Sequence, residues 1–337
     1  MVFILPIHAR ESGQLAAHGT AMSACLPSDM ADGQAVGRLA SLTRPGVSLV
    51  CAADVLAGYV IAAPALPRPE ETLAAVPLLF AGAFLLTVAG HVFSCCFSPA
   101  GALLAGPVAP GRVTLKAAFL LGALAAVGGL FATMGAALST GRLPVYFAAL
   151  LFLVTWARAG RGAELAVLGP VSAGAARALT LAVGMSAHSE VVYLVSPGPP
   201  LAAGLFFVYG ALAEAVRQTE REGGRRYVLL AASLGFLAVF VISASALART
   251  EMAWIMMFTG AILLAARAWP AVRSLTPADV RRFTQVAFLA GCFLDAGLCF
   301  GRWPAEGAVL ALGASALLLV LPGIAIMARV VADVTSV

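Results

Sequence analysis

Charged residues are scarce in this 337-residue chain, because only 11% of its residues are Asp, Glu, Lys or Arg, while 61% are hydrophobic. In an ordinary soluble domain about a quarter of the residues are charged, so this composition excludes that class. Lysine is almost absent, with Lys116 alone beside twenty arginines, and no CxxC pair occurs among the six cysteines. Neither a zinc site nor a disulfide framework is therefore indicated.

Long apolar runs are what the chain has in abundance, and its mean hydropathy is +0.96. Each run can cross a hydrocarbon core, which takes about 20 residues as a helix. Only helices and closed barrels satisfy the backbone in lipid, and these runs lack the alternation of barrel strands. The sequence thus predicts an all-α, multi-pass transmembrane bundle of nine or ten helices. The expected spans are residues 47–66, 75–97, 115–138, 143–158, 166–187, 195–216, 227–247, 251–268, 283–301 and 306–331.

The first 46 residues are polar and mixed, without the period of a helix or strand, and we interpret them as a cytoplasmic N-terminal extension. The remainder, residues 47–337, is then one transmembrane domain. Loops after the second, fourth, sixth and eighth predicted spans carry twelve Lys or Arg residues, whereas the five intervening loops carry four. The positive-inside rule places the even-numbered loops and both termini in the cytoplasm, with the bundle in the inner (plasma) membrane. This topology explains the net charge of +5 without a nucleic-acid partner.

Ionisable side chains inside apolar spans are costly, and they mark functional sites by default. Asp54, Arg177 and Asp295 lie within spans, and Glu214 lies near a predicted cytoplasmic end. Either aspartate could pair with Arg177 as a purely structural clamp. We favour a ligand-binding role for Arg177, because both aspartates are on distant segments of the sequence. We expect the helices that carry these four side chains to enclose a cavity open to the cytoplasm.

Five stretches of the sequence each resemble a segment of a known protein family. They are "LTRPGVSLVCAADVLAGYVIA" (42–62), "PVAPGRVT" (107–114), "GPVSAGAARALTLAVGMS" (169–186), "VYGALAEAVRQTEREGG" (208–224) and "TPADVRRFTQVAFLAGCFLDAG" (276–297). The first two resemble the first helix and a proline-rich loop of the UbiA-type membrane prenyltransferases. The last three are similar to segments of the UbiA-like EboC branch. The resemblance covers roughly residues 38–333 in separate pieces.

The resemblance implies transfer of a prenyl group from a polyprenyl diphosphate to an acceptor, with Mg²⁺ held against the diphosphate by aspartate-rich motifs. The first motif would fall at Ser94, Cys95, Ser98 and Ala102, so all of its carboxylates are missing. Hydroxyls and thiols do not replace carboxylates around a hard cation. The second motif would fall at Glu214 and Glu220. Because these residues are six positions apart, they lie on different sides of a helix. Mg²⁺ is therefore expected only through the resemblance, and we assign no metal ligand.

Cationic side chains remain where the resemblance implies an anionic head group, at Arg112, Lys116 and Arg177. The predicted substrate-binding set is Arg177, Arg112, Lys116, Asp54, Glu214, Glu220 and Asp295. One candidate function is a divergent prenyltransferase that stabilises the departing diphosphate with Arg and Lys. The alternative is a non-catalytic membrane protein that binds an isoprenoid or another lipid or assists its transport. A solute transporter fits less well, because the two halves show no inverted repeat. The expected partners are the bilayer and a polyprenyl diphosphate or another isoprenoid lipid.

Overall fold

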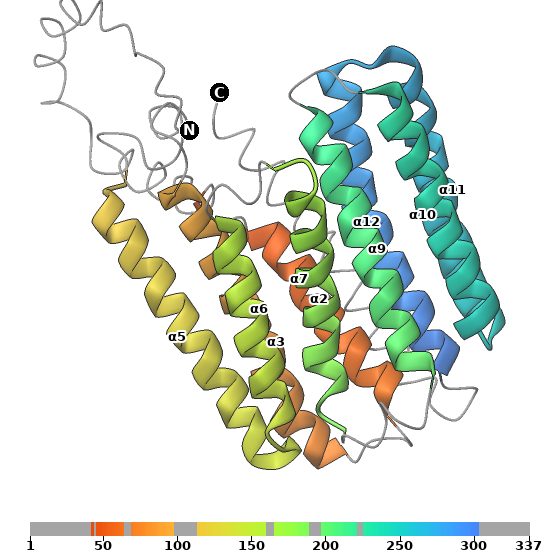
Figure 1. Ribbon diagram of the computed structural model, residues 1–337. Helices are drawn as coiled ribbons and strands as arrows, with labels where there is room; N and C mark the ends of the chain where they lie inside the picture. Colours follow the sequence, from red (N-terminus) through yellow and green to blue (C-terminus); the bar gives the residue numbers. More distant parts are fainter. Residues whose placement is uncertain are drawn as a thin grey trace, which may run out of the picture.

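The computed structural model describes residues 42–43, 45–63, 69–97, 113–159, 165–188, 197–220 and 225–302. Within these ranges the chain forms nine long helices (Figure 1). They are α2 (Pro45–Ala62), α3 (Pro69–Cys96), α5 (Leu115–Thr140), α6 (Leu143–Ala159), α7 (Leu168–Met185), α9 (Gly198–Thr219), α10 (Arg226–Leu247), α11 (Glu251–Ser274) and α12 (Pro277–Arg302). The all-α prediction is confirmed.

Seven of these helices are long and apolar enough to cross a membrane, and α2 and α6 are shorter apolar helices. The chain is a multi-pass membrane protein with seven candidate spans. Nine of the ten predicted spans coincide with described helices, while the span at 306–331 and nearly all of the N-terminal extension lie outside the described residues. The predicted orientation and the predicted membrane stay predictions.

Helices α11 and α12 are longer than the spans predicted for them, 251–268 and 283–301. Helix α11 continues to Ser274, and α12 already begins at Pro277. The turn that joins them is built from side-chain caps, since the Thr276 hydroxyl accepts a hydrogen bond from the Asp279 amide at 3.2 Å. Such a cap satisfies a backbone N–H that a helix end leaves free. Hydropathy identifies only the part of a helix that is apolar enough for hydrocarbon. It therefore does not predict the polar turns that extend the helix at its ends.

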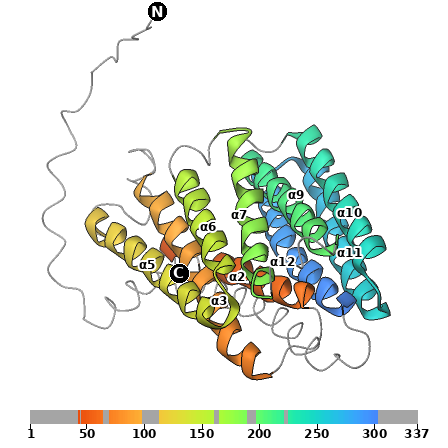
Figure 2. The ribbon, with the colours of Figure 1, turned by 60° about the horizontal axis from the view of Figure 1, so that its bottom comes forward.

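The bundle has a flank made of α3, α5 and α6, and a second flank made of α9, α10, α11 and α12 (Figures 1 and 2). Helices α2 and α7 lie between the flanks and pack against each other. Helix α2 also contacts α3, α9 and α12, and α7 also contacts α6 and α9. Residues in the middle of α2 and α7 are therefore at the centre of the bundle.

Glycine allows α2 and α7 to touch backbone to backbone. A Cβ atom built on Gly184 of α7 would lie 1.9 Å from the carbonyl oxygen of Val55, and one built on Gly58 of α2 would lie 2.1 Å from that of Leu181. No side chain fits at either position without moving the helices apart. Close approach through small residues is a common way for membrane helices to pack, since lipid supplies no hydrophobic drive between them.

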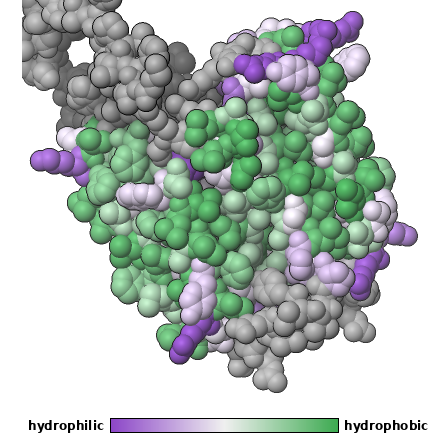
Figure 3. Space-filling view, in the orientation of Figure 1, coloured by the Kyte–Doolittle hydropathy of each residue, from purple (hydrophilic) through white to green (hydrophobic). Residues whose placement is uncertain are grey.

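The outside of the bundle is apolar. Large hydrophobic side chains are exposed along it, for example Leu138, Leu234 and Phe131, which are 92%, 67% and 66% exposed. In Figure 3 hydrophobic residues cover most of the visible face, and hydrophilic residues gather mainly at its margins. A surface of this kind suits contact with lipid, because a soluble protein rarely exposes so large an apolar area.

Candidate functional site

Three ionisable side chains meet at the centre of the bundle, and we call Asp54, Arg177 and Asp295 the central cluster. Arg177 of α7 donates from Nε to Asp54 Oδ2 at 2.9 Å and from Nη2 to Asp54 Oδ1 at 3.0 Å. Asp295 of α12 has its Oδ2 atom 3.9 Å from Arg177 Nη2. Asp54 and Asp295 are completely buried, and Arg177 is 6% exposed. A bidentate ion pair in the cluster joins α7 to α2, and the longer contact between Arg177 and Asp295 joins α7 to α12.

The surroundings of Arg177 are shaped for its guanidinium group. The group lies 5.5 Å from the ring centre of Phe206 and 5.1 Å from that of Tyr209, both on α9. Aromatic rings at such distances attract a cation through their quadrupole. Gly291 of α12 leaves the necessary room, because a Cβ atom there would lie 2.6 Å from Arg177 Nη2. Four helices therefore take part in holding this side chain.

The structure brings together three residues that the sequence separates widely, since Asp54 and Arg177 are 123 positions apart. One of the two reasons for preferring a ligand role for Arg177, the distance of the aspartates along the chain, therefore does not hold, while the other, the position that the resemblance implies, is untested. The contacts are those of the clamp that we considered as the alternative. A ligand role for the central cluster stays a prediction.

Glu214 belongs to a second group, which we call the Glu214 cluster. It is 4% exposed, and its Oε2 atom accepts hydrogen bonds from Arg158 Nη2 at 2.5 Å and Arg217 Nε at 2.9 Å. Arg217 Nη2 also donates to Oε1. The four predicted charges thus form two groups, because Glu214 is held by its own arginines, and a common cavity between them stays a prediction. The sequence analysis missed both partners, although the spacing of three between Glu214 and Arg217 is typical of a pair on one helix face.

Glu220 accepts a hydrogen bond from Arg281 Nε at 2.6 Å and also interacts electrostatically with Arg217 of the Glu214 cluster. Lys116 is exposed on the first turn of α5. Arg112, Ser98 and Ala102 lie outside the described residues. Of the predicted binding set, only Asp54, Arg177 and Asp295 form one group.

The donor atoms in the described ranges do not suit Mg²⁺. At the position of the first motif, the Ser94 hydroxyl donates to the Gly90 carbonyl at 2.8 Å. At the position of the second motif, the Glu214 carboxylate is already neutralised by two guanidinium groups. The described part of the chain also holds no group of three or more His, Cys, Asp or Glu side chains placed to bind a metal ion. We therefore derive no chemistry through a metal.

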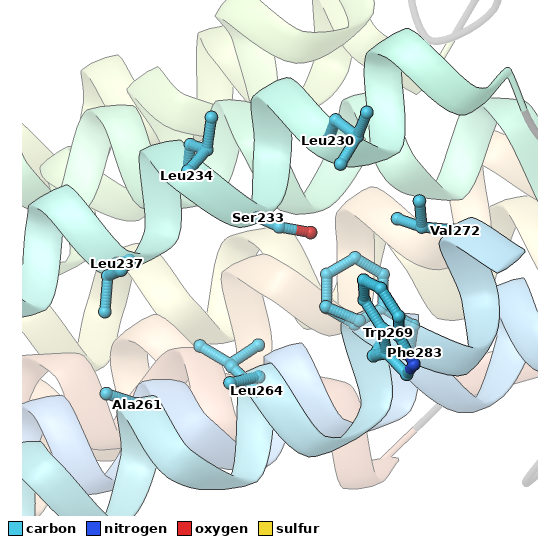
Figure 4. Close-up of a pocket in the computed structure, with 11 residues that line it drawn as sticks. Leu230, Ser233, Leu234, Leu237, Ala261, Leu264, Trp269, Val272 and Phe283 are labelled. Carbon is cyan, nitrogen blue, oxygen red and sulfur yellow. The ribbon is translucent and has the colours of Figure 1, made fainter.

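An apolar groove of about 200 Å³ lies between α10 and α11, with Phe283 of α12 at its wall (Figure 4). Leu230, Leu234 and Leu237 line it from α10, and their side chains are exposed on the outside of the bundle. Its polar lining residue is Ser233, whose hydroxyl donates to the Leu229 carbonyl at 2.6 Å. The groove can take up hydrocarbon, and it is separate from both ionic clusters.

Comparison with known proteins gives a likeness in structure and none in sequence. No protein-family model matches the chain, and no curated protein has significant sequence similarity to it. A solved structure of digeranylgeranylglyceryl phosphate synthase aligns over 80% of this chain and 99% of its own, with a TM-score of 0.55 and 13% identity. A UbiA homologue from Archaeoglobus fulgidus, bound to GPP and Mg²⁺, aligns over 77% and 99% with a TM-score of 0.45 and 12% identity. At such identities the first likeness establishes architecture alone: the chain has a UbiA-like fold.

Proposed function

We propose that this chain binds an isoprenoid lipid with an anionic head group and does not carry out Mg²⁺-dependent prenyl transfer. The observation that carries the proposal is the Glu214 cluster, in which two arginines surround one carboxylate. The cluster has a net charge of +1, which attracts an anion. The cluster lies at the position where the resemblance implies metal-binding carboxylates. A site that binds Mg²⁺ would carry a net negative charge, whereas this cluster carries a net positive charge.

The arginines of this cluster are suited to a phosphate. Arg158 is 26% exposed and Arg217 is 34% exposed, while Glu214 between them is almost fully buried. A guanidinium group has several N–H donors, and the bonds to Glu214 use one from Arg158 and two from Arg217. The remaining donors of each group can bind phosphate oxygens through charge-assisted hydrogen bonds. The buried carboxylate keeps both side chains in place for this contact.

The fold supports the choice of ligand class. Digeranylgeranylglyceryl phosphate synthase, by its name, makes a lipid with isoprenoid chains and a phosphate, and it shares this architecture. A lipid-facing helical bundle provides apolar surface for such chains.

Chelation of Mg²⁺ tests the proposal directly. Geranylgeranyl diphosphate is expected to raise the thermal unfolding temperature of the purified protein equally in EDTA and in excess Mg²⁺, because cationic side chains supply the positive charge. Geranylgeraniol, which lacks the diphosphate, serves as the control and is expected to stabilise less. Release of diphosphate that requires Mg²⁺ would contradict the proposal and establish prenyl-transfer chemistry instead.

Replacement of Arg217 tests the head-group site. Arg217→Gln is expected to weaken geranylgeranyl diphosphate binding about ten-fold, which corresponds to the loss of one charge-assisted hydrogen bond. The fold should persist, since Arg158 still neutralises Glu214. A matched control is Arg282→Gln, because Arg282 also pairs with an acid three positions away, Asp279, but outside the Glu214 cluster. Equal loss of binding in both variants, measured by titration calorimetry, would rule out a specific site at Arg217.

A further inference from the structure

The charges of the central cluster do not balance. Asp54 and Asp295 bring two carboxyl groups, and Arg177 brings one guanidinium group. If both carboxyl groups were ionised, the cluster would carry one uncompensated negative charge. Its members come from α7, α12 and α2, the helix that contacts both of the others, and two of its three side chains have no exposed surface.

Asp295 is the member that lacks partners. Both of its carboxyl oxygens are buried without a hydrogen-bond partner among the described residues. The distance of 3.9 Å from Asp295 Oδ2 to Arg177 Nη2 is too long for a hydrogen bond. The Nε and Nη2 atoms of Arg177 donate to Asp54 instead. Asp295 and Asp54 nevertheless face the same guanidinium nitrogen, because Arg177 Nη2 lies 3.0 Å from Asp54 Oδ1 and 3.9 Å from Asp295 Oδ2. Two ionised carboxylates at that nitrogen would repel each other, and neither could donate a hydrogen bond to the other, because each can only accept.

Among the described residues, the groups around Asp295 supply no second positive charge. Those that interact with it electrostatically are Asp54 and Cys51 on α2, Arg177 on α7, Tyr209 on α9, and Cys292 and Cys299 on α12 itself. Arg177 is the cation of this described set. The hydroxyl of Tyr209 donates to the Ala287 carbonyl and is thus committed elsewhere. An isolated buried carboxylate is so unfavourable that such a group takes up a proton instead.

We propose that the central cluster is a proton-binding site, in which Asp295 holds one proton as a neutral carboxylic acid and donates it in a hydrogen bond to Asp54. The proton restores neutrality, and it turns two facing acceptors into a donor and an acceptor. Loss of this proton would place two negative charges side by side at the joint of α2, α7 and α12. The site is independent of the isoprenoid ligand proposed above, and it lies within the bundle rather than at its surface.

Infrared spectroscopy of the purified protein without added ligand tests the site. At neutral pH the wild type is expected to show the C=O stretching band of a buried protonated carboxylic acid, and Asp295→Asn to lack it. The matched control is Asp279→Asn on the same helix, where Asp279 is outside the buried cluster and its carboxylate accepts from Thr276 Oγ1 at 2.9 Å. The control is expected to keep the band. A wild-type spectrum without this band would overturn the proposal.

Two further measurements assign the band to an aspartic acid and distinguish a bound proton from a bound metal cation. Labelling wild-type aspartate with ¹³C must shift the band, which assigns it to an aspartic acid even if the Asn variant does not fold. Thermal unfolding of the wild type in NaCl and in choline chloride separates a proton from a metal cation. Equal stability in the two salts is expected, whereas a specific stabilisation by Na⁺ that Asp295→Asn abolishes would show that a metal ion supplies the missing charge.

Discussion

Arg177→Ala is expected to lower the free energy of unfolding by about 3–5 kcal/mol, the cost of leaving a buried charge without its partner. The carboxylate of Asp54 would remain fully buried between α2 and α7 after losing both hydrogen bonds from the guanidinium group. The contact with the rings of Phe206 and Tyr209 would be lost as well. Thermal and denaturant unfolding of the purified variant measure the effect.

A double replacement provides the internal control for Arg177. Adding Asp54→Asn removes the unpaired charge, so the double variant is expected to recover much of the stability lost by Arg177→Ala. Arg142→Ala, at an exposed position before α6, should be close to neutral. If Arg177→Ala instead kept its stability and lost geranylgeranyl diphosphate binding, Arg177 would hold the ligand head group, as we favoured from the sequence.

Gly184→Leu is expected to have an effect of similar size, a loss of about 3 kcal/mol or more, the upper range for overfilling a packed interior. The new Cβ atom would lie 1.9 Å from the Val55 carbonyl oxygen and 2.8 Å from the Tyr59 amide nitrogen. Both are backbone atoms of α2, so no side-chain rotation relieves the clash. The helices would have to separate, which also breaks the ion pair between Arg177 and Asp54. Thermal unfolding and size-exclusion chromatography measure the loss.

A glycine elsewhere in the bundle provides the comparison for Gly184. A Cβ atom built on Gly204 of α9 would have no atom within 4 Å, and this residue is exposed. Gly204→Leu is therefore expected to change the free energy of unfolding by no more than about 0.5 kcal/mol, as for most surface changes. Wild-type stability in Gly184→Leu would mean that α2 and α7 lie farther apart than the structure places them.

The two ionic clusters differ in sign, and the two roles that we propose for them rest on this difference. The central cluster has an excess of carboxyl groups and is closed to solvent, so it suits a proton and the joining of helices. The Glu214 cluster has an excess of arginine and is partly open, so it suits an anionic head group. An arginine at membrane depth is thus not by itself an anion site, because its partners decide the net charge that a ligand meets.

The sequence by itself determined that the chain is an all-α membrane protein, and it located the nine described helices to within six residues at each end. Hydropathy is a local property, and of the two structures that lipid allows, helices and closed barrels, these apolar runs without alternation fit the helix. Only the tertiary structure decided that Arg177 pairs with Asp54, 123 positions away, and that Glu214 pairs with Arg158, 56 positions away. The helices are apolar on nearly every side, so their sequences do not reveal which face turns inward. Packing of glycine against backbone joins α2 to α7, and it thereby brings Asp54 and Arg177 together.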